Sequence, residues 1–313
     1  MKKPWSSFSP PDHWKSNGEP TYLENKDNNG NIIGILDKYE NDYLTRSLVN
    51  DETLAKKHIL FSGDSFIYGH GVTRGNTISD YFDKLTSDDY SCFNLGVPGA
   101  GNDIALLRLQ QWCNKFGNQT HTVYFGISNL TRIAHWESEN IDWTWDDSVY
   151  DEEANQWNWW YRASQTIPTQ VGYEKRIERA KTIHTSYQNL LSNVQSMVRF
   201  DTTIQAVINL SKAYNFNIYF FDTCCEFNYK DVEIIKEQTE DYNIKWCKSY
   251  DAKPMSTLGK LSDKERDKYY IKNDGHWSSK GNKKVASVLY NETKEWYKKY
   301  GLSKSGKKFE EDT

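Results

Sequence analysis

From residue 57 onward, short apolar runs alternate with longer segments in which apolar residues recur every three or four positions. The short runs are bounded by turn residues and are typical of buried strands. They cover residues 58–62, 90–95, 121–127 and 216–223. The longer segments predict helices with one apolar face, and they cover residues 77–87, 102–116, 173–214 and 278–301. Strands alternating with helices of this length predict an α/β fold, with a parallel sheet and helices on both of its faces.

Two regions depart from this rhythm. Residues 1–56 are rich in Pro, Gly, Asn and Asp, and they predict an irregular N-terminal arm with room for one short hairpin. Residues 130–173 show no clear period, although they hold half of the chain's 12 tryptophans. The sequence therefore predicts an arm over 1–56, an α/β domain over 57–301 that carries the Trp-rich insertion, and a flexible C-terminal tail over 302–313.

Composition narrows the range of partners. The net charge of −4 gives no general attraction to nucleic acid or to anionic membranes. No apolar run approaches the ~20 residues that cross a bilayer, and residues 1–20 lack the apolar stretch of a signal peptide. The five cysteines are odd in number and lack metal-binding spacing, which predicts reduced thiols. We expect a cytoplasmic or virion-associated protein without nucleic-acid or membrane partners, and homo-oligomerisation stays open.

Candidate reactive groups follow the predicted strands. Ser65 follows the first strand, in the stretch HILFSGDSFIYGHGV, and a glycine loop, GVPGAGN, follows the second. Ser128 and Asn129 follow the third strand, and NDGHWSSKGN precedes the last helix. The carboxyl ends of parallel strands meet at one edge of a sheet, where ligands bind. Each feature alone is also typical of a turn or a helix cap, but together they supply every part of a site for acyl transfer.

Acyl transfer requires a nucleophile, a base that removes its proton, a carboxylate that orients the base, and donors for the oxyanion. The expected nucleophile is Ser65, the expected base is His276, and the expected carboxylate is Asp274. The expected oxyanion donors are the N–H of Ser65, the N–H of Gly99 and the side-chain amide of Asn129. No third or fourth ligand is apparent near Asp274 and His276, so no metal is expected.

Three further polar residues lie close to these candidates in the sequence. His70 is interpreted as a loop residue, with a place in the lining of the pocket as the weaker alternative, and Asp64 is expected to hold the turn rather than to react. Arg132 is a candidate for binding a substrate carboxylate, with a surface ion pair as the equal alternative.

Four sequence blocks resemble those of the SGNH/GDSL hydrolases, in the same order. They read FSGDSFIYGHGV, NLGVPGAGN, FGISN and NDGHWSSKGN. The resemblance covers residues 57–130 and 217–296 approximately, and it carries over to the site residues named above. It implies a flavodoxin-like three-layer α/β/α fold and an ester substrate, with neither metal nor cofactor.

The chain departs from the family pattern at two places. The last block of the family usually has Asp three residues before the histidine, but Asn273 stands there and Asp274 lies two residues before it. Asn273 is therefore a second, weaker candidate for the residue that orients His276. This D-x-H spacing resembles the branches that contain carbohydrate O-acetyl esterases and transferases. The third block usually reads G-x-N-D, whereas Asn129 comes one residue late, so Ser128 stays an alternative donor to the oxyanion.

The Trp-rich insertion bears on the substrate. Trp157, Trp159 and Trp160 interleave with acidic residues, a combination that suits the stacking of sugar rings and the binding of their hydroxyls; a lid or an oligomer interface is the equal alternative. The sequence thus predicts a serine ester hydrolase that removes O-acetyl groups from a glycan, or from another acylated small molecule, through an acyl-enzyme. The alternatives are an O-acetyltransferase with the same triad, and a non-catalytic glycan-binding or virion structural protein on the same scaffold.

Overall fold

The computed structural model describes most of the α/β domain and parts of the regions that flank or interrupt it. The described residues are 22–26, 32–37, 45–47, 49–97, 100–128, 130, 133–137, 140–145, 150–151, 156–157, 160–161, 193–223, 229–247, 267–271 and 275–297. The predicted tail over 302–313 and the first half of the predicted helical segment, residues 173–192, lie outside them.

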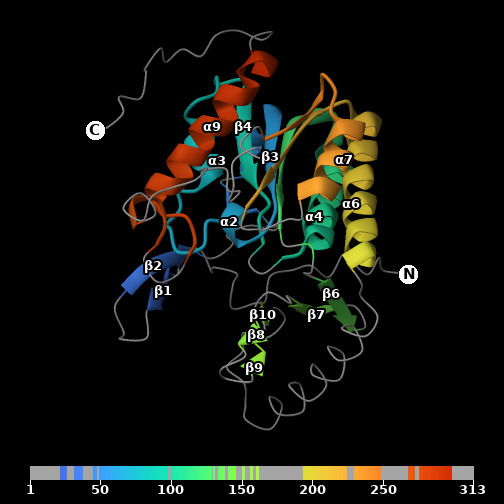
Figure 1. The fold of residues 1–313 in the computed structure, drawn as a ribbon. Helices are drawn as coiled ribbons and strands as arrows, with labels where there is room; N and C mark the ends of the chain where they lie inside the picture. Colours follow the sequence, from blue (N-terminus) through green and yellow to red (C-terminus); the bar gives the residue numbers. More distant parts are fainter. Residues whose placement is uncertain are drawn as a thin grey trace.

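A five-stranded parallel sheet forms the centre of the molecule (Figure 1). Its strands are β3 (Lys57–Ser62), β4 (Tyr90–Asn94), β5 (Thr120–Ile127), β11 (Asn217–Asp222) and β12 (Ile244–Trp246). They lie in the order β12-β11-β5-β3-β4, and every neighbouring pair is parallel. Numbered along the chain and read from β4, this order is 2-1-3-4-5, that of a flavodoxin-like fold. The predicted fold class is confirmed.

Helices cover both faces of this sheet (Figure 1). One face carries α3 (Ile78–Asp83) and α9 (Ser279–Tyr297), and the other carries α4 (Asn102–Phe116), α6 (Asn193–Tyr214) and α7 (Tyr229–Thr239). The short helices α1 (Asp51–Ala55) and α2 (Ser65–Tyr68) precede and follow β3, and a 3₁₀ turn, η3 (Gly117–Gln119), leads into β5. Apolar side chains from both faces, including fully buried Phe61, Phe125 and Phe220, form the core. The result is a three-layer α/β/α arrangement.

Two elements lie in a segment for which the sequence pattern predicted none. The helix α7 and the strand β12 both fall between residues 224 and 270. Only three residues of β12 are paired, which is too short a run to show a period. In α7, Val232 and Ile235 are buried whereas Ile234 is about half exposed, so its apolar face is narrow.

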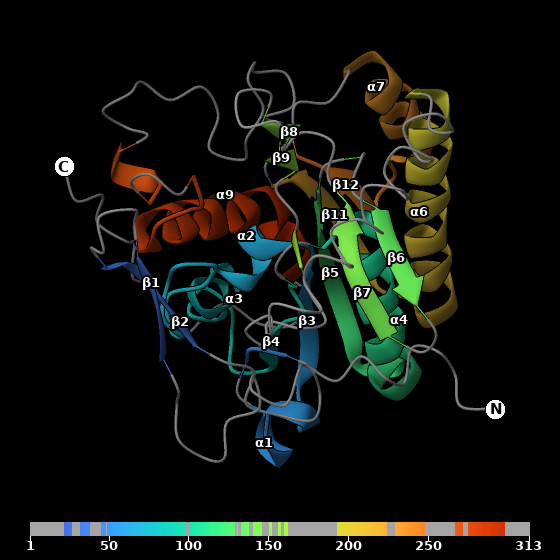
Figure 2. The same ribbon diagram turned by 90° about the horizontal axis from the view of Figure 1, so that it is seen from below.

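The Trp-rich insertion contains antiparallel strands. A three-stranded sheet is formed by β6 (Ile133–Glu137), β7 (Asn140–Trp145) and β10 (Trp160–Tyr161), and β8 (Tyr150–Asp151) pairs with β9 (Gln156–Trp157). A bulge between His135 and Trp136 shifts the alternation of β6, and strands of two residues show none, which explains the missing period. Both views place these strands beyond the edge of the main sheet where α2 lies (Figures 1 and 2).

The N-terminal arm contains the short hairpin that the sequence allowed for. Its strands are β1 (Tyr22–Lys26) and β2 (Ile32–Asp37), which pair antiparallel. Farther along the arm, residues 45–47 bind the end of β4: Arg46 N–H donates to Asn94 O, and Asn94 N–H donates to the hydroxyl of Ser47.

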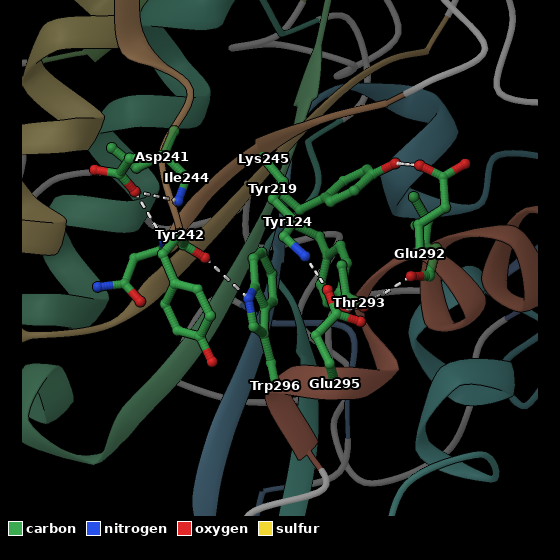
Figure 3. A network of polar contacts seen from close by, with 12 residues as sticks. Tyr124, Tyr219, Asp241, Tyr242, Ile244, Lys245, Glu292, Thr293, Glu295 and Trp296 are labelled. Carbon is green, nitrogen blue, oxygen red and sulfur yellow. Dashed lines mark hydrogen bonds and ion pairs between the residues drawn. The ribbon is translucent and has the colours of Figure 1, made fainter.

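Polar contacts fix α9 against the sheet (Figure 3). The hydroxyl of Tyr124 on β5 bonds Thr293, and that of Tyr219 on β11 bonds Glu292. Near its end, the indole N–H of Trp296 donates to the carbonyl of Tyr242 at 3.2 Å. Because α9 begins three residues after His276, these contacts also set where that histidine lies.

Candidate active site

The turn between β3 and α2 presents Ser65 at the carboxyl edge of the sheet. Asp64 is the N-cap of α2: its carboxylate accepts from Phe66 N–H at 3.0 Å and from the hydroxyl of Thr223, after β11, also at 3.0 Å. A side chain at Gly63 would lie 2.5 Å from the side chain of Ile67, so only glycine lets the helix start this close to the strand. Asp64 therefore holds the turn, as expected, and Ser65 becomes the first helical residue.

A buried arginine from the N-terminal arm ends this short helix. The guanidinium of Arg46 donates to the carbonyls of Tyr68 and Gly69, each at 2.6 Å, and to that of Val72 at 2.5 Å. Gly69 has a φ of +79°, a left-handed conformation that suits glycine at a helix end. Arg46 thus fixes the loop that follows Ser65, and no sequence pattern marked it for this role.

His276 reaches Ser65 from the other end of the chain. Its Nε2 lies 2.8 Å from Ser65 Oγ, and only 9% of the residue's surface is exposed. A hydrogen bond fixes the backbone around it: Ile271 N–H donates to His276 O at 2.7 Å. The preceding residue, Gly275, has the left-handed φ of +83° that suits a glycine. The structure therefore brings together the two residues that the sequence proposed as nucleophile and base.

A polar cluster around Asn76 joins the loop after Ser65 to the start of α9. The amide oxygen of Asn76 accepts from Ser279 at 3.0 Å and from Tyr81 at 2.8 Å. Its backbone carbonyl accepts from the side chain of Asn282 at 3.0 Å. This cluster joins segments that are about 200 residues apart in the sequence, and it was not foreseen from the sequence.

The backbone after β5 is held by Asn102, the first residue of α4. Ser128 N–H donates to the amide oxygen of Asn102 at 2.8 Å, and the amide nitrogen of Asn102 donates to Ser128 O at 3.1 Å. The backbone N–H of Ser128 is therefore bonded to Asn102, and the choice between Asn129 and Ser128 as oxyanion donor stays a prediction. Asn102 follows the glycine loop directly, and that position is the one signal that could have singled it out.

Several predicted site residues lie outside the described part of the chain. They are Gly99, Asn129, Arg132, Trp159, Asn273 and Asp274. Of Trp157 and Trp160, the backbone in β9 and β10 is described. The roles of the six residues that lie outside the described part stay predictions.

Within the described residues, the N–H of Ser65 donates to no acceptor, as an oxyanion donor requires.

His70 lies against the candidate base. Its ring centroid is 4.5 Å from that of His276, and the two rings are inclined by 40°. The sequence interpreted His70 as a loop residue; it does lie in a loop, but this loop places its ring at the site.

Solved structures with a similar fold include several hydrolases of the GDSL/SGNH type. A G-D-S-L family protein from Desulfitobacterium hafniense DCB-2 is 11% identical, with 75% of this chain and 99% of that chain covered and a TM-score of 0.42. A family 3 carbohydrate esterase from Clostridium thermocellum is 12% identical, with 78% and 98% covered and a TM-score of 0.40. A lipase/acylhydrolase from Enterococcus faecalis is 11% identical, with 76% and 96% covered and a TM-score of 0.39.

The other comparisons found no relative. No protein-family model matches the chain, and no curated protein matches it. The assignment to an α/β/α fold follows from the strand order of this chain itself. In the described segments, no helix combines the length and the apolar character needed to cross a membrane.

Proposed function

We propose that this protein is a serine ester hydrolase of the SGNH type, and that it removes O-acetyl groups from a carbohydrate. One observation supports the chemistry most strongly: Ser65 Oγ lies 2.8 Å from His276 Nε2 at the carboxyl edge of a flavodoxin-like sheet. A nucleophile within hydrogen-bond distance of a base is the arrangement that acyl transfer requires.

The reaction would proceed through an acyl-enzyme. His276 takes the proton of Ser65 while the hydroxyl oxygen attacks the acyl carbonyl, and the resulting imidazolium gives that proton to the leaving alkoxide. The oxyanion binds the N–H of Ser65 together with Gly99 and Asn129. Asp274 orients the imidazole. Water, deprotonated by His276, then releases the acyl group and regenerates Ser65.

Hydrolysis of p-nitrophenyl acetate tests this chemistry. The wild-type protein should release p-nitrophenol, and Ser65→Ala should not do so above the uncatalysed rate. No turnover by the pure wild-type protein, with this ester or with acetylated oligosaccharides, would leave the non-catalytic glycan-binding alternative. Adding a sugar acceptor and analysing the products separates esterase from O-acetyltransferase, since only the transferase makes an acetylated acceptor.

The carbohydrate part of the proposal rests on the strands of the insertion. The pairing of β10 with β7 aligns Trp160 with Thr144 and Tyr161 with Trp143. Because directly paired residues share a face and successive residues alternate, Trp160 and Trp143 belong to opposite faces of this sheet. A glycan platform on one face would use the aromatic residues of that face and not those of the other.

This face difference gives a matched test of the platform. Trp143→Ala and Trp160→Ala should differ in their KM for an acetylated oligosaccharide. The variant on the platform face should have a higher KM than wild type, and the variant on the other face serves as its control. Trp157→Ala and Trp159→Ala complete the series. None should change turnover of p-nitrophenyl acetate, because that small ester does not need the platform. Equal damage to both substrates by all four variants would show that the tryptophans stabilise the fold instead.

A further inference from the structure

The ring of His276 contacts two aromatic rings from the segment that carries Ser65. The centroid of Phe66 lies 4.8 Å from that of His276, with the rings inclined by 37°. His70 is closer, at 4.5 Å and 40°. The nucleophile and these two rings thus come from one segment of six residues, and the base itself comes from the far end of the chain.

The place of His70 is fixed by its backbone. Its N–H donates to Ser65 O at 2.9 Å, and it stands between Gly69 and Gly71, which both have a φ of +79°. Arg46 binds the carbonyl of Gly69, just before His70, and that of Val72, two residues after it. A loop held at so many points presents its side chain to His276 reproducibly.

We propose that His70 is a positioning residue for the reaction: its ring, together with that of Phe66, keeps Nε2 of His276 directed at Ser65 and stabilises the imidazolium that forms during catalysis. This inference rests on the proposed function. The physical reason is twofold. The ring of Phe66 lies within the ~6 Å at which an aromatic quadrupole attracts a cation, and the packed ring of His70 limits rotation of the imidazole away from the hydroxyl.

His70 allows a cleaner test than Phe66. The ring of Phe66 also packs against Trp277, at 4.9 Å, so its removal would disturb the start of α9. His70 is only partly buried, so a smaller side chain there leaves no closed cavity in the core. Its replacement should therefore change catalysis much more than stability.

Three replacements distinguish the contribution of the ring from that of the side-chain volume. His70→Phe keeps a ring, His70→Leu keeps much of the volume without a ring, and His70→Ala keeps neither. We expect Leu and Ala to lower kcat for p-nitrophenyl acetate about tenfold with little change in KM, because the imidazole of His276 would be held less firmly toward Ser65. Phe should stay within about threefold of wild type.

His121→Ala is the matched control, because His121 packs against Tyr90 and Tyr297, at 5.1 and 5.6 Å, near the start of β5 rather than at the carboxyl edge. It should lower Tm without changing kcat. The rate at which a fluorophosphonate labels Ser65 provides a second readout that does not depend on deacylation, and it should fall in parallel with kcat in the Leu and Ala variants.

Two results would overturn the inference: wild-type kcat and labelling in His70→Ala or His70→Leu, or a loss in His70→Phe as large as in His70→Ala. Failure of the proposed function looks different. In that case the wild-type protein neither turns over the ester nor becomes labelled at Ser65, whatever residue stands at position 70.

Discussion

Two histidines lie near opposite ends of β3, and their surroundings differ in one respect that decides what each can do. His58, near the start of the strand, accepts from the indole N–H of Trp112 at Nδ1 and donates from Nε2 to Leu54 O. Both of its nitrogens are bonded to fixed groups. At the other end, Nε2 of His276 faces the hydroxyl of Ser65, which can lose its proton.

Aromatic rings surround both histidines, so the rings alone do not distinguish them. Those around His58 belong to Phe93, Trp112 and Phe116, with centroids 4.9 to 5.6 Å away. Burial lowers the pKa of His58 to about 4, which keeps it neutral at physiological pH. A histidine with two fixed partners is therefore structural, whereas one with a labile partner and some exposure can carry a proton in a reaction.

The largest expected effect is the loss of kcat when Ser65 or His276 is replaced. Ser65→Ala and His276→Ala should each lower kcat by about a thousandfold or more, because the members of such a unit fail together. Thermal unfolding should change little, since Ser65→Ala deletes one hydroxyl at the surface of the site. Retention of more than a tenth of wild-type activity by Ser65→Ala would show that another residue is the nucleophile.

A smaller loss is expected at the oxyanion. Asn129→Ala should lower kcat roughly 100-fold, the scale for one preorganised donor. Ser128→Ala should cost little, because the contacts of Ser128 with Asn102 use its backbone. The two variants are compared by kcat for p-nitrophenyl acetate, and a greater loss in Ser128→Ala would place Ser128 in the hole.

His58→Leu should have the opposite profile to His276→Ala. It should lower the free energy of unfolding by about 2 kcal/mol, since the buried indole N–H of Trp112 loses its acceptor, while kcat of the folded protein stays the same. The measurements are chemical denaturation and turnover per folded molecule. A fall in kcat without a fall in stability would break the distinction between the two histidines.

His58 also predicts a pH dependence of stability. In the unfolded chain it takes up a proton near pH 6.5, but in the folded protein only near pH 4. The contribution of His58 to stability should therefore be complete above pH 6.5 and be lost as the pH drops toward 4. His58→Leu should remove this contribution. His121, whose pKa burial also lowers to about 4, should contribute in the same direction.

The smallest effect is expected at Asp222, the last residue of β11. Burial raises the pKa of Asp222 from 3.8 to about 7. Between these values the unfolded chain loses the proton first, so this carboxyl lowers stability as the pH rises from 4 to 7. Asp222→Asn has no proton to lose. Its stability relative to wild type should therefore be greater at pH 8 than at pH 4; an equal effect at both pH values would exclude the buried carboxyl as its cause.

Periodicity and local motifs were sufficient to predict most of the fold and the two residues at the centre of the site. The apolar runs that became β3, β4, β5 and β11 are long enough to show as strands, and their alternation with helices defined a parallel sheet. Ser65 and His276 could be named because each stands in a short motif beside such an element.

The residues that brace the site could not be named, because their contacts are distant in sequence. Arg46 binds carbonyls 22 to 26 residues away, and a lone arginine between Thr45 and Ser47 gives no signal of burial. Asn76 meets Ser279 and Asn282 across more than 200 positions. The strands of the insertion could not be predicted for another reason: several are two residues long, and a bulge breaks the alternation of β6.

The contact between residues 45–47 and β4 has a consequence for association between copies of the chain. In the part of the chain that the structure describes, β4 is the outermost strand of the main sheet, with β3 on one side only. Unpaired N–H and C=O groups on an outer strand can recruit the same strand of another molecule. Arg46 N–H and the hydroxyls of Thr45 and Ser47 occupy both backbone groups of Asn94, at the end of that strand. The segment that fixes the loop beyond Ser65 thus also blocks the edge, so its loss would favour aggregation as well as inactivity.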